Sequence, residues 1–233
     1  MIEQSKAKIF LAQERGRNET NVMRSYKTFN SGNFFNEHKN AFGNLCLLND
    51  DTLAPGEKVK MFVEEEGYII FLPIAGGILY NDSTGNAAAI MAGEAQVKHT
   101  LPGTVIEIEN PYKDALVNYI QMRFRSDEQP FAEINEVVSF DIDNNKNHLV
   151  PIAKQNAGLP FGLYIAKVEG RSEIIYKLEN KDNGVYAYVI EGAFEVQNRL
   201  LHERDGLALW EVSEIDAEAL SNNAILLIAE ISL

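Results

Sequence analysis

The chain has 233 residues, of which 45% are hydrophobic and 24% charged, and its 34 acidic against 21 basic residues give a net charge of −13. This composition is that of an ordinary globular protein, and no apolar run approaches the roughly 20 residues that cross a bilayer. A chain with this negative charge repels phosphate backbones, and we therefore expect no direct nucleic-acid binding. Because the sequence has no long apolar run, we also expect no membrane insertion.

The cysteine content and the N-terminal residues indicate the redox environment and the compartment of the protein. The single cysteine, Cys46, excludes an internal disulfide and a cysteine-based zinc cluster. The first ten residues show no basic-then-apolar signal pattern, so the expected compartment is the cytoplasm. The one local group of basic residues, within residues 6–17, is expected to be a solvated N-terminal segment. Nothing in the sequence fixes the oligomeric state.

Short strand-like runs dominate the chain. They are rich in β-branched and aromatic residues, several alternate with period two, and turn clusters such as NDSTGN and NKDNG bound them. The clearest runs are residues 68–74, 104–109, 116–124, 162–168 and 185–192. Helical patterns are few, and the best short helix candidate is residues 216–223. Many short strands between turns predict an all-β sandwich or barrel.

The sequence also contains a weak internal repeat. YIIFLPIAGGILYND followed by MAGEAQV in the first half matches VYAYVIEGAFEVQN followed by ERDGLAL in the second. Each half reads as strand, glycine turn, strand, and a Gly-marked turn into a third strand, which predicts two tandem barrels of one type. The expected boundaries are an N-terminal barrel at residues 1–125, a linker at 126–150 and a C-terminal barrel at 151–233.

From about Gly16 to its end, the chain resembles the pirins, which are bicupins. The segments that match in order are FGNLCLLNDDTLAPG, NDSTGN, GEAQ and YIQMRF in the first half, and LYIAKVEG and AYVIEGAFEVQN in the second. The resemblance implies two cupin-type β-barrels (double-stranded β-helices) with few short helices. It also implies one metal ion, usually iron, held in the N-terminal barrel by three histidines and a glutamate. Some pirins have quercetin dioxygenase activity, and others bind proteins as cofactors of transcription.

The first cupin motif of that family keeps its frame here but not its ligands. Gly56 and Gly76 stand at the family's glycine positions. Phe62 and Glu64 occupy the two positions of the His-x-His pair, and Tyr68 occupies the glutamate-like position that follows. Tyr68 and Glu64 form either a hydrogen-bonded pair in a pocket or separate core and rim residues.

The second motif leaves two alignments, which differ by one residue. Without a gap, the remaining ligand positions fall on Ile106 and Ile108; with a one-residue insertion, they fall on Glu107 and Glu109. Because side chains alternate faces along a strand, only one of these pairs can face the barrel interior. Burying unpaired carboxylates near Glu64 is costly, so inward isoleucines are favoured.

Either alignment predicts a degenerate metal site. With isoleucines inward, Glu64 is the only ligand that remains, and no cofactor is predicted. With glutamates inward, an all-oxygen set of Glu64, Glu107 and Glu109 would suit a hard cation rather than iron. The four histidines are too scattered in the sequence to form an evident cluster. His38 is expected on the surface and His99 in an exposed loop, whereas His148 falls in the expected linker and His202 near a turn of the second barrel.

We therefore expect a pirin-like bicupin that is non-catalytic and binds a small apolar ligand or a protein partner, with Phe62 pointing inward to fill the space of a metal ion. The alternatives are an oxidoreductase resembling quercetin 2,3-dioxygenase and an enzyme with a carboxylate-only metal site.

Overall fold

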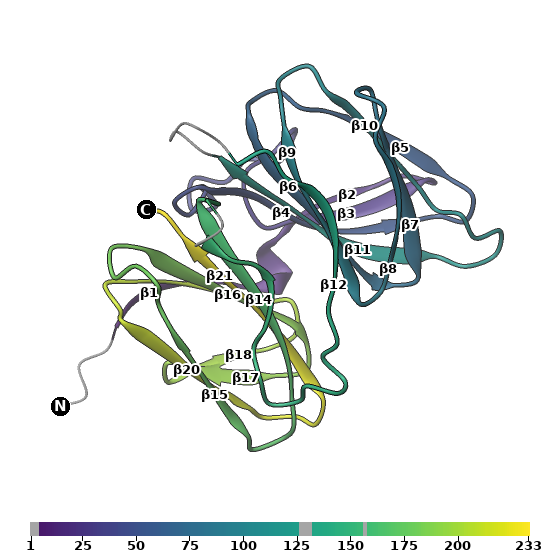
Figure 1. Cartoon of the computed structure of the whole chain (residues 1–233). Helices are drawn as coiled ribbons and strands as arrows, with labels where there is room; N and C mark the ends of the chain where they lie inside the picture. Colours follow the sequence, from purple (N-terminus) through teal and green to yellow (C-terminus); the bar gives the residue numbers. More distant parts are fainter. Residues whose placement is uncertain (1–4, 126–131, 156–157) are drawn as a thin grey trace. The chain divides into compact units, whose positions relative to one another are not determined.

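The structure is a computed structural model that describes residues 5–125, 132–155 and 158–233 (Figure 1). Nearly all of its regular structure is strand, and the described residues contain one short helix, the 3-10 turn η1 (Ala12–Glu14). None of the helices in the described part of the chain is long and apolar enough to span a bilayer. Contacts divide the chain into two units, which we call the N-terminal barrel (Arg15–Ala41 and Leu45–Ser139) and the C-terminal barrel (Met1–Glu14, Phe42–Asn44 and Phe140–Leu233).

The N-terminal barrel consists of a seven-stranded and a four-stranded sheet, both antiparallel. The larger sheet has the order β12 (Asn135–Ser139), β9 (Glu94–Thr100), β6 (Gly67–Ala75), β11 (Val117–Arg125), β4 (Leu45–Leu53), β3 (Met23–Lys27), β2 (Gly16–Glu19). The smaller sheet has the order β5 (Lys58–Phe62), β10 (Val105–Glu109), β7 (Gly77–Asp82), β8 (Ala87–Met91).

The C-terminal barrel consists of a six-stranded and a four-stranded antiparallel sheet. The larger sheet has the order β1 (Lys6–Phe10), β19 (Gly206–Trp210), β16 (Gly184–Glu191), β21 (Ala224–Ile231), β14 (Phe161–Val168), β13 (Val150–Ala153). The smaller sheet has the order β15 (Glu173–Lys177), β20 (Glu214–Ala219), β17 (Phe194–Val196), β18 (Arg199–Leu201).

The strand orders of the two barrels correspond position by position. β9-β6-β11-β4 in one barrel matches β19-β16-β21-β14 in the other, and β5-β10-β7-β8 matches β15-β20-β17-β18. Both segments of the internal repeat lie at equivalent places, on β6 to β9 and on β16 to β19. The predicted all-β fold of two cupin-type barrels is therefore confirmed.

Two edge strands place the barrel boundaries differently from the sequence prediction. β1 pairs with β19 through Lys6↔Trp210 to Phe10↔Gly206, so residues 6–10 of the basic N-terminal segment form an edge strand of the C-terminal barrel, on which Lys6 and Lys8 are exposed. β12, within the expected linker 126–150, pairs with β9 and closes the equivalent edge of the N-terminal barrel. Residues 126–131 of that linker lie outside the described residues.

The predicted helix at residues 216–223 is wrong, because its first half lies on β20 and its second half forms a turn. Ile215, Ala217 and Ala219 are buried along this strand, whereas Asp216 and Glu218 alternate with them on the other face. This period-two burial outweighs the helix propensity of alanine and glutamate.

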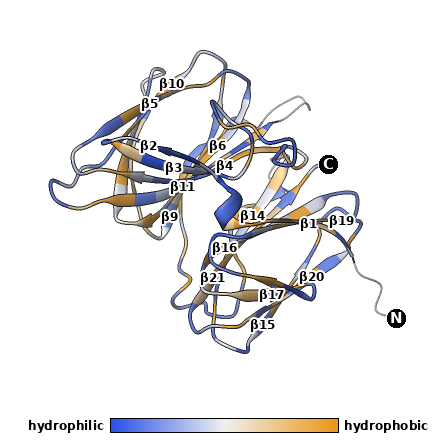
Figure 2. Ribbon diagram, turned by 180° about the vertical axis from the view of Figure 1, so that it is seen from behind, coloured by the Kyte–Doolittle hydropathy of each residue, from blue (hydrophilic) through white to orange (hydrophobic). Residues whose placement is uncertain are grey.

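Each barrel has its own hydrophobic core. The C-terminal core is the larger and includes Phe194, Leu207, Leu226 and Ile228. The N-terminal core includes Phe71, Ile78, Tyr80 and Tyr119. In both barrels hydrophobic stretches lie along the strands and hydrophilic stretches along the connecting loops (Figure 2).

One buried carboxylate fixes a turn in the C-terminal barrel. Glu230 on β21 is 0% exposed. It accepts hydrogen bonds from the Tyr176 hydroxyl (2.6 Å), the Asn183 side-chain amide (2.7 Å) and the backbone N–H groups of Glu179 and Asn180 (2.8 and 2.9 Å). Burial, with the Glu230 carboxylate, raises the pKa of Tyr176 far above its usual range. Glu230 therefore holds the turn after β15 against β21.

We expect Glu230→Ala to lower the free energy of unfolding by at least about 3 kcal/mol, because several buried donors lose their acceptor at once. Urea unfolding followed by circular dichroism measures this loss. Glu195→Ala, which removes an exposed glutamate from β17 of the same barrel, is the matched control. Equal stabilities of the two variants would show that Glu230 does not fix the turn.

Candidate functional site

Strand β10 resolves the two alignments of the second motif. Ile106 and Ile108 are both 0% exposed and belong to the core of the N-terminal barrel. Ile106 lies opposite Met61 on β5, and Ile108 lies opposite Val59, both of which pack against the same core. The prediction that the isoleucines face inward is confirmed.

Glu107 and Glu109 consequently lie on the other face of the sheet. Glu109 pairs with Lys58 at 2.6 Å, and Glu107 lies 3.4 Å from Lys60. Among residues 5–125, 132–155 and 158–233, no three His, Cys, Asp or Glu side chains are grouped so that they could share a metal ion. A carboxylate-only site at Glu64, Glu107 and Glu109 is therefore wrong, because the alternation along β10 turns the last two away from the interior.

Phe62 does not fill the barrel, contrary to expectation. Its side chain is 69% exposed. On β5 and just beyond it, Val59, Met61 and Val63 contact the core, so Phe62 and Glu64 take the alternate face. The four positions that would hold a metal ion thus divide into an exposed pair on one segment and a buried isoleucine pair on the other.

Tyr68 and Glu64 are separate core and rim residues. Tyr68 is 0% exposed, and its hydroxyl donates to the Ala132 carbonyl oxygen at 3.2 Å, which ties β6 to the segment before β12. Its ring centroid lies 5.3 Å from that of His99. Glu64 is exposed.

The largest of the cavities described here opens beside Phe62 and Glu64. We call it the barrel cavity; its volume is about 590 Å³. Its inner wall combines polar and apolar side chains of the larger sheet and β5: Lys27, Cys46, Leu47, Asn49, Met61, Ile69, Gln121 and Arg123. Lys60, Glu65 and Arg125 line it as exposed residues, like Phe62 and Glu64.

A polar row crosses three strands in this wall. Lys27 on β3 lies opposite Asn49 on β4, which lies opposite Gln121 on β11. Asn49 is only 8% exposed, and its Oδ1 atom is buried with no hydrogen-bond partner among the described residues. Gln121 is 6% exposed, and its amide nitrogen contacts the Met61 sulfur at 3.2 Å, a weak acceptor.

The two cations of the inner wall are held by backbone oxygens. The Lys27 ammonium donates to the Ser31 carbonyl at 3.0 Å, and the Arg123 guanidinium donates to the Glu65 carbonyl at 2.8 Å. Both side chains are half-buried, and the described residues give neither an ion pair. This polar row was not predicted from the sequence. Its signal was polar residues at alternate positions, Asn49 and Asp51 in LLNDDTL and Gln121 and Arg123 in YIQMRF.

Two residues along the same three strands, a second polar row contains a buried carboxyl group. Asp51 lies opposite Ser25 and Tyr119 and is 0% exposed. Both of its oxygens and the Tyr119 hydroxyl are buried without a hydrogen-bond partner in the described part of the chain. Burial raises the pKa of Asp51 to about 7; the Asp50 charge adds to the rise, whereas Ser25 and Lys27 lower it. Burial also raises the pKa of Tyr119, and Asp51 adds to that rise.

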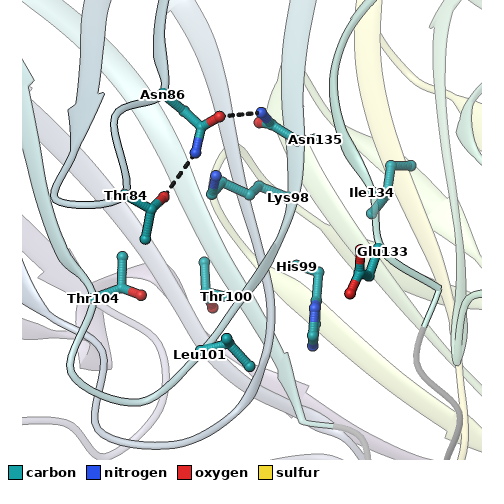
Figure 3. Close-up of a pocket in the computed structure, with 10 residues that line it drawn as sticks. All are labelled: Thr84, Asn86, Lys98, His99, Thr100, Leu101, Thr104, Glu133, Ile134 and Asn135. Atoms are coloured by element: carbon teal, nitrogen blue, oxygen red, sulfur yellow. Dashed lines mark hydrogen bonds between the residues drawn. The ribbon is translucent and has the colours of Figure 1, made fainter.

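A second pocket of about 390 Å³ lies at the ends of β9 and β12 (Figure 3). There Asn135 donates to Asn86 at 2.9 Å, and Asn86 donates to Thr84 at 2.7 Å. Behind them Lys98 pairs with Asp82 at 2.9 Å. Burial by itself raises the pKa of the Asp82 carboxyl, but hydrogen bonds from Thr84, Tyr80 and Lys98 hold it well below its usual range. These polar groups satisfy one another, unlike those of the barrel cavity.

The histidines differ in exposure. His38 is exposed, as expected, and so are His148 and His202. His99, expected in an exposed loop, lies instead on β9 with its side chain 11% exposed, and its Nε2 atom is 3.2 Å from a Glu66 oxygen. His99 is mostly buried because β9 continues to Thr100, so that His99 lies on the strand opposite Tyr68 of β6.

Comparisons with known proteins cover most of the chain. Residues 159–229 match a family profile described as the quercetinase C-terminal cupin domain. The chain is 22% identical over 220 residues to "Quercetin 2,3-dioxygenase" of Escherichia coli strain K12, covering 93% of this chain and 95% of the relative. It is 27% identical over 139 residues to "Pirin-like protein YhaK" of Escherichia coli O157:H7, covering 60% of this chain and 59% of that one.

The fold is shared with solved structures. The crystal structure of YhhW from Escherichia coli superimposes with a TM-score of 0.87 at 20% identity, covering 97% of both chains. A structure of the bacterial pirin YhhW in complex with nickel(II) gives the same TM-score at 19% identity, covering 97% of this chain and 99% of that one.

Asp51 makes stability depend on pH. Its pKa rises from 3.8 to about 7 on folding, so between these values the folded protein keeps a proton that the unfolded chain has lost, and stability falls as pH rises through this window. We expect Asp51→Asn to be more stable than the parent protein at pH 8, by on the order of 3 kcal/mol, and to lose much of the fall between pH 4 and 7. Thermal unfolding across this pH range measures the effect, with exposed Asp114→Asn as the control. An unchanged pH profile in Asp51→Asn would show that Asp51 ionises normally.

Proposed function

We propose that this chain is a pirin-like member of the cupin superfamily and that it binds a small organic molecule in the barrel cavity of its N-terminal barrel without a histidine-held metal ion. The observation that carries this proposal is an open cavity of about 590 Å³ that borders Phe62 and Glu64 of the family's first metal motif and is lined by a buried amide oxygen with no partner in the described residues. Small-molecule sites typically have volumes of about 300–1,000 Å³ and a few placed polar groups.

The residues present do not fit the family's metal ion. Iron in this setting requires imidazole and carboxylate donors around one point. The four matching positions offer a phenyl ring, one exposed carboxylate and two buried isoleucines, namely Phe62, Glu64, Ile106 and Ile108. Hydrocarbon side chains cannot donate electron pairs to a metal, so we derive no step of a reaction through such an ion.

The polar side chains in the wall of the barrel cavity do not suit the small apolar ligand that the sequence led us to expect. Lys27, Asn49, Gln121 and Arg123 require polar groups on whatever occupies it. A protein partner remains the other kind of occupant that we propose, and the cytoplasm remains the expected compartment on the grounds of a single cysteine.

A quercetin 2,3-dioxygenase activity is the second candidate, because relatives with that name align over 93% of the chain. Oxygen uptake with quercetin, measured with added Fe(II), Ni(II), Cu(II) or Mn(II), decides between the two. Sustained turnover with any of these ions would establish the dioxygenase and overturn the metal-free proposal.

We expect protein purified without chelators to contain far less than one equivalent of iron, nickel, copper or manganese by elemental analysis, because the motif positions lack donors. A stoichiometric redox metal would contradict this expectation whatever its ligands.

We also expect Glu64→Ala to change the free energy of unfolding by less than about 0.5 kcal/mol, since the side chain is exposed. Its metal content should equal that of the parent protein. A loss of bound metal in this variant, measured by the same elemental analysis, would show that Glu64 is a ligand.

A further inference from the structure

We propose that the ligand of the barrel cavity is a small carboxylate with an apolar body and a hydroxyl group. The inference rests on the proposed function and adds the chemical class of the ligand. Its carboxylate is held by Lys27 and Arg123, its hydroxyl donates to Asn49, and its apolar body contacts Leu47, Met61 and Ile69.

The lining of the barrel cavity has an excess of positive charge, whereas the whole chain is negatively charged. The whole chain carries −13, yet four basic side chains and two acidic ones line this cavity: Lys27, Lys60, Arg123, Arg125, Glu64 and Glu65. Lys60 and Arg125 are exposed and pair with Glu107 and Glu65. A local excess of positive charge in a concave, partly desolvated wall attracts a small anion.

The two inner cations are available to such an anion. In the described residues, the Lys27 ammonium donates to the Ser31 carbonyl oxygen and the Arg123 guanidinium donates to the Glu65 carbonyl oxygen. Both acceptors are uncharged, and the bond to Glu65 uses one of the five N–H donors of Arg123. A carboxylate accepts charge-assisted hydrogen bonds from both side-chain types, and these are about twice as strong as bonds between neutral groups.

The neutral wall specifies the rest of the molecule. Asn49 is more than nine-tenths buried, and its unpartnered Oδ1 atom requires a donor, which a hydroxyl supplies and a carboxylate does not. On the same wall Ile69 is 1% exposed, and Leu47 and Met61 are half-buried, so an apolar body finds a matching surface.

The rate at which Cys46 is alkylated reports whether the barrel cavity is occupied, without an assay of enzymatic activity. It is the only cysteine in the chain, it lines the cavity, and its Sγ atom lies 3.4 Å from the Arg123 carbonyl. Alkylation by N-ethylmaleimide therefore labels this one site, and a bound ligand slows it. The probes are 3-hydroxybenzoate, its neutral analogue 3-hydroxybenzamide, benzoate and inorganic phosphate.

We expect 3-hydroxybenzoate to slow alkylation of the intact protein in a saturable way. The amide, which lacks the charge, and phosphate, which lacks the apolar body, should need at least about tenfold higher concentrations for the same effect. Benzoate should bind several-fold more weakly than 3-hydroxybenzoate, and Asn49→Leu should remove that difference.

Lys27→Gln tests the charge, because glutamine keeps a donor for the Ser31 carbonyl and removes the ammonium. It should raise the protecting concentration of 3-hydroxybenzoate about tenfold, whereas the control Lys113→Met, an exposed lysine of the same barrel, should leave it unchanged. A circular dichroism melt confirms folding of each variant. If Lys27→Gln does not fold, Arg123→Gln takes its place and should also weaken protection, because it removes the other charge that holds the carboxylate.

The outcomes separate the two proposals. Equal protection by acid and amide would overturn the carboxylate assignment and leave ligand binding standing. Equal protection by phosphate would overturn the apolar body. Protection that is unchanged in Lys27→Gln would overturn the role of Lys27. No protection by any organic probe would overturn both this inference and the proposed function.

Discussion

Neighbouring side chains on β10 point to opposite faces of its sheet, and this alternation decides what the N-terminal barrel can hold. With Ile106 and Ile108 inside, the interior loses two donor positions and gains hydrocarbon that packs against Val59 and Met61. The glutamates between them are left on the outer face with Lys58 and Lys60. One residue of register would exchange these sets and place two carboxylates in the core, at a cost that only a bound cation could offset.

The two barrels use the same strand order for different purposes. The C-terminal core is formed of apolar side chains, and its buried carboxylate, Glu230, receives four hydrogen bonds. The interior of the N-terminal barrel is apolar at β10 but polar along β3, β4 and β11, where Asn49, Asp51 and Tyr119 carry buried atoms without partners in the described chain. Such groups weaken a fold, so they are found where a ligand or a proton is handled more often than in a purely structural core. The contrast supports the ligand site that we propose in the N-terminal barrel.

The sequence predicted the fold more fully than the site, for a physical reason. Period-two patterns and glycine turns are local, so runs such as residues 68–74 and 185–192 correspond to β6 and β16, and the repeat revealed two barrels. The partners of β1 and β12 depend on pairing between distant residues, which no local pattern records. Energetic cost correctly placed Ile106 inside, but Phe62 followed the alternation of β5 rather than its hydrophobicity. The polar row was missed because a residue such as Asn49 reads as solvent-facing until its strand neighbours are known.

The place of β1 has a consequence for how the protein is made. Synthesis begins at the N-terminus, yet residues 6–10 find their hydrogen-bonding partners only in residues 206–210, about two hundred residues later. The N-terminal barrel, whose segments all lie between residues 15 and 139, is complete on the ribosome well before that point. Strand β1 is therefore synthesised before the N-terminal barrel but ordered after it, and until it pairs, the exposed edge of β19 and the unpaired β1 strand are both open to pairing with other nascent chains.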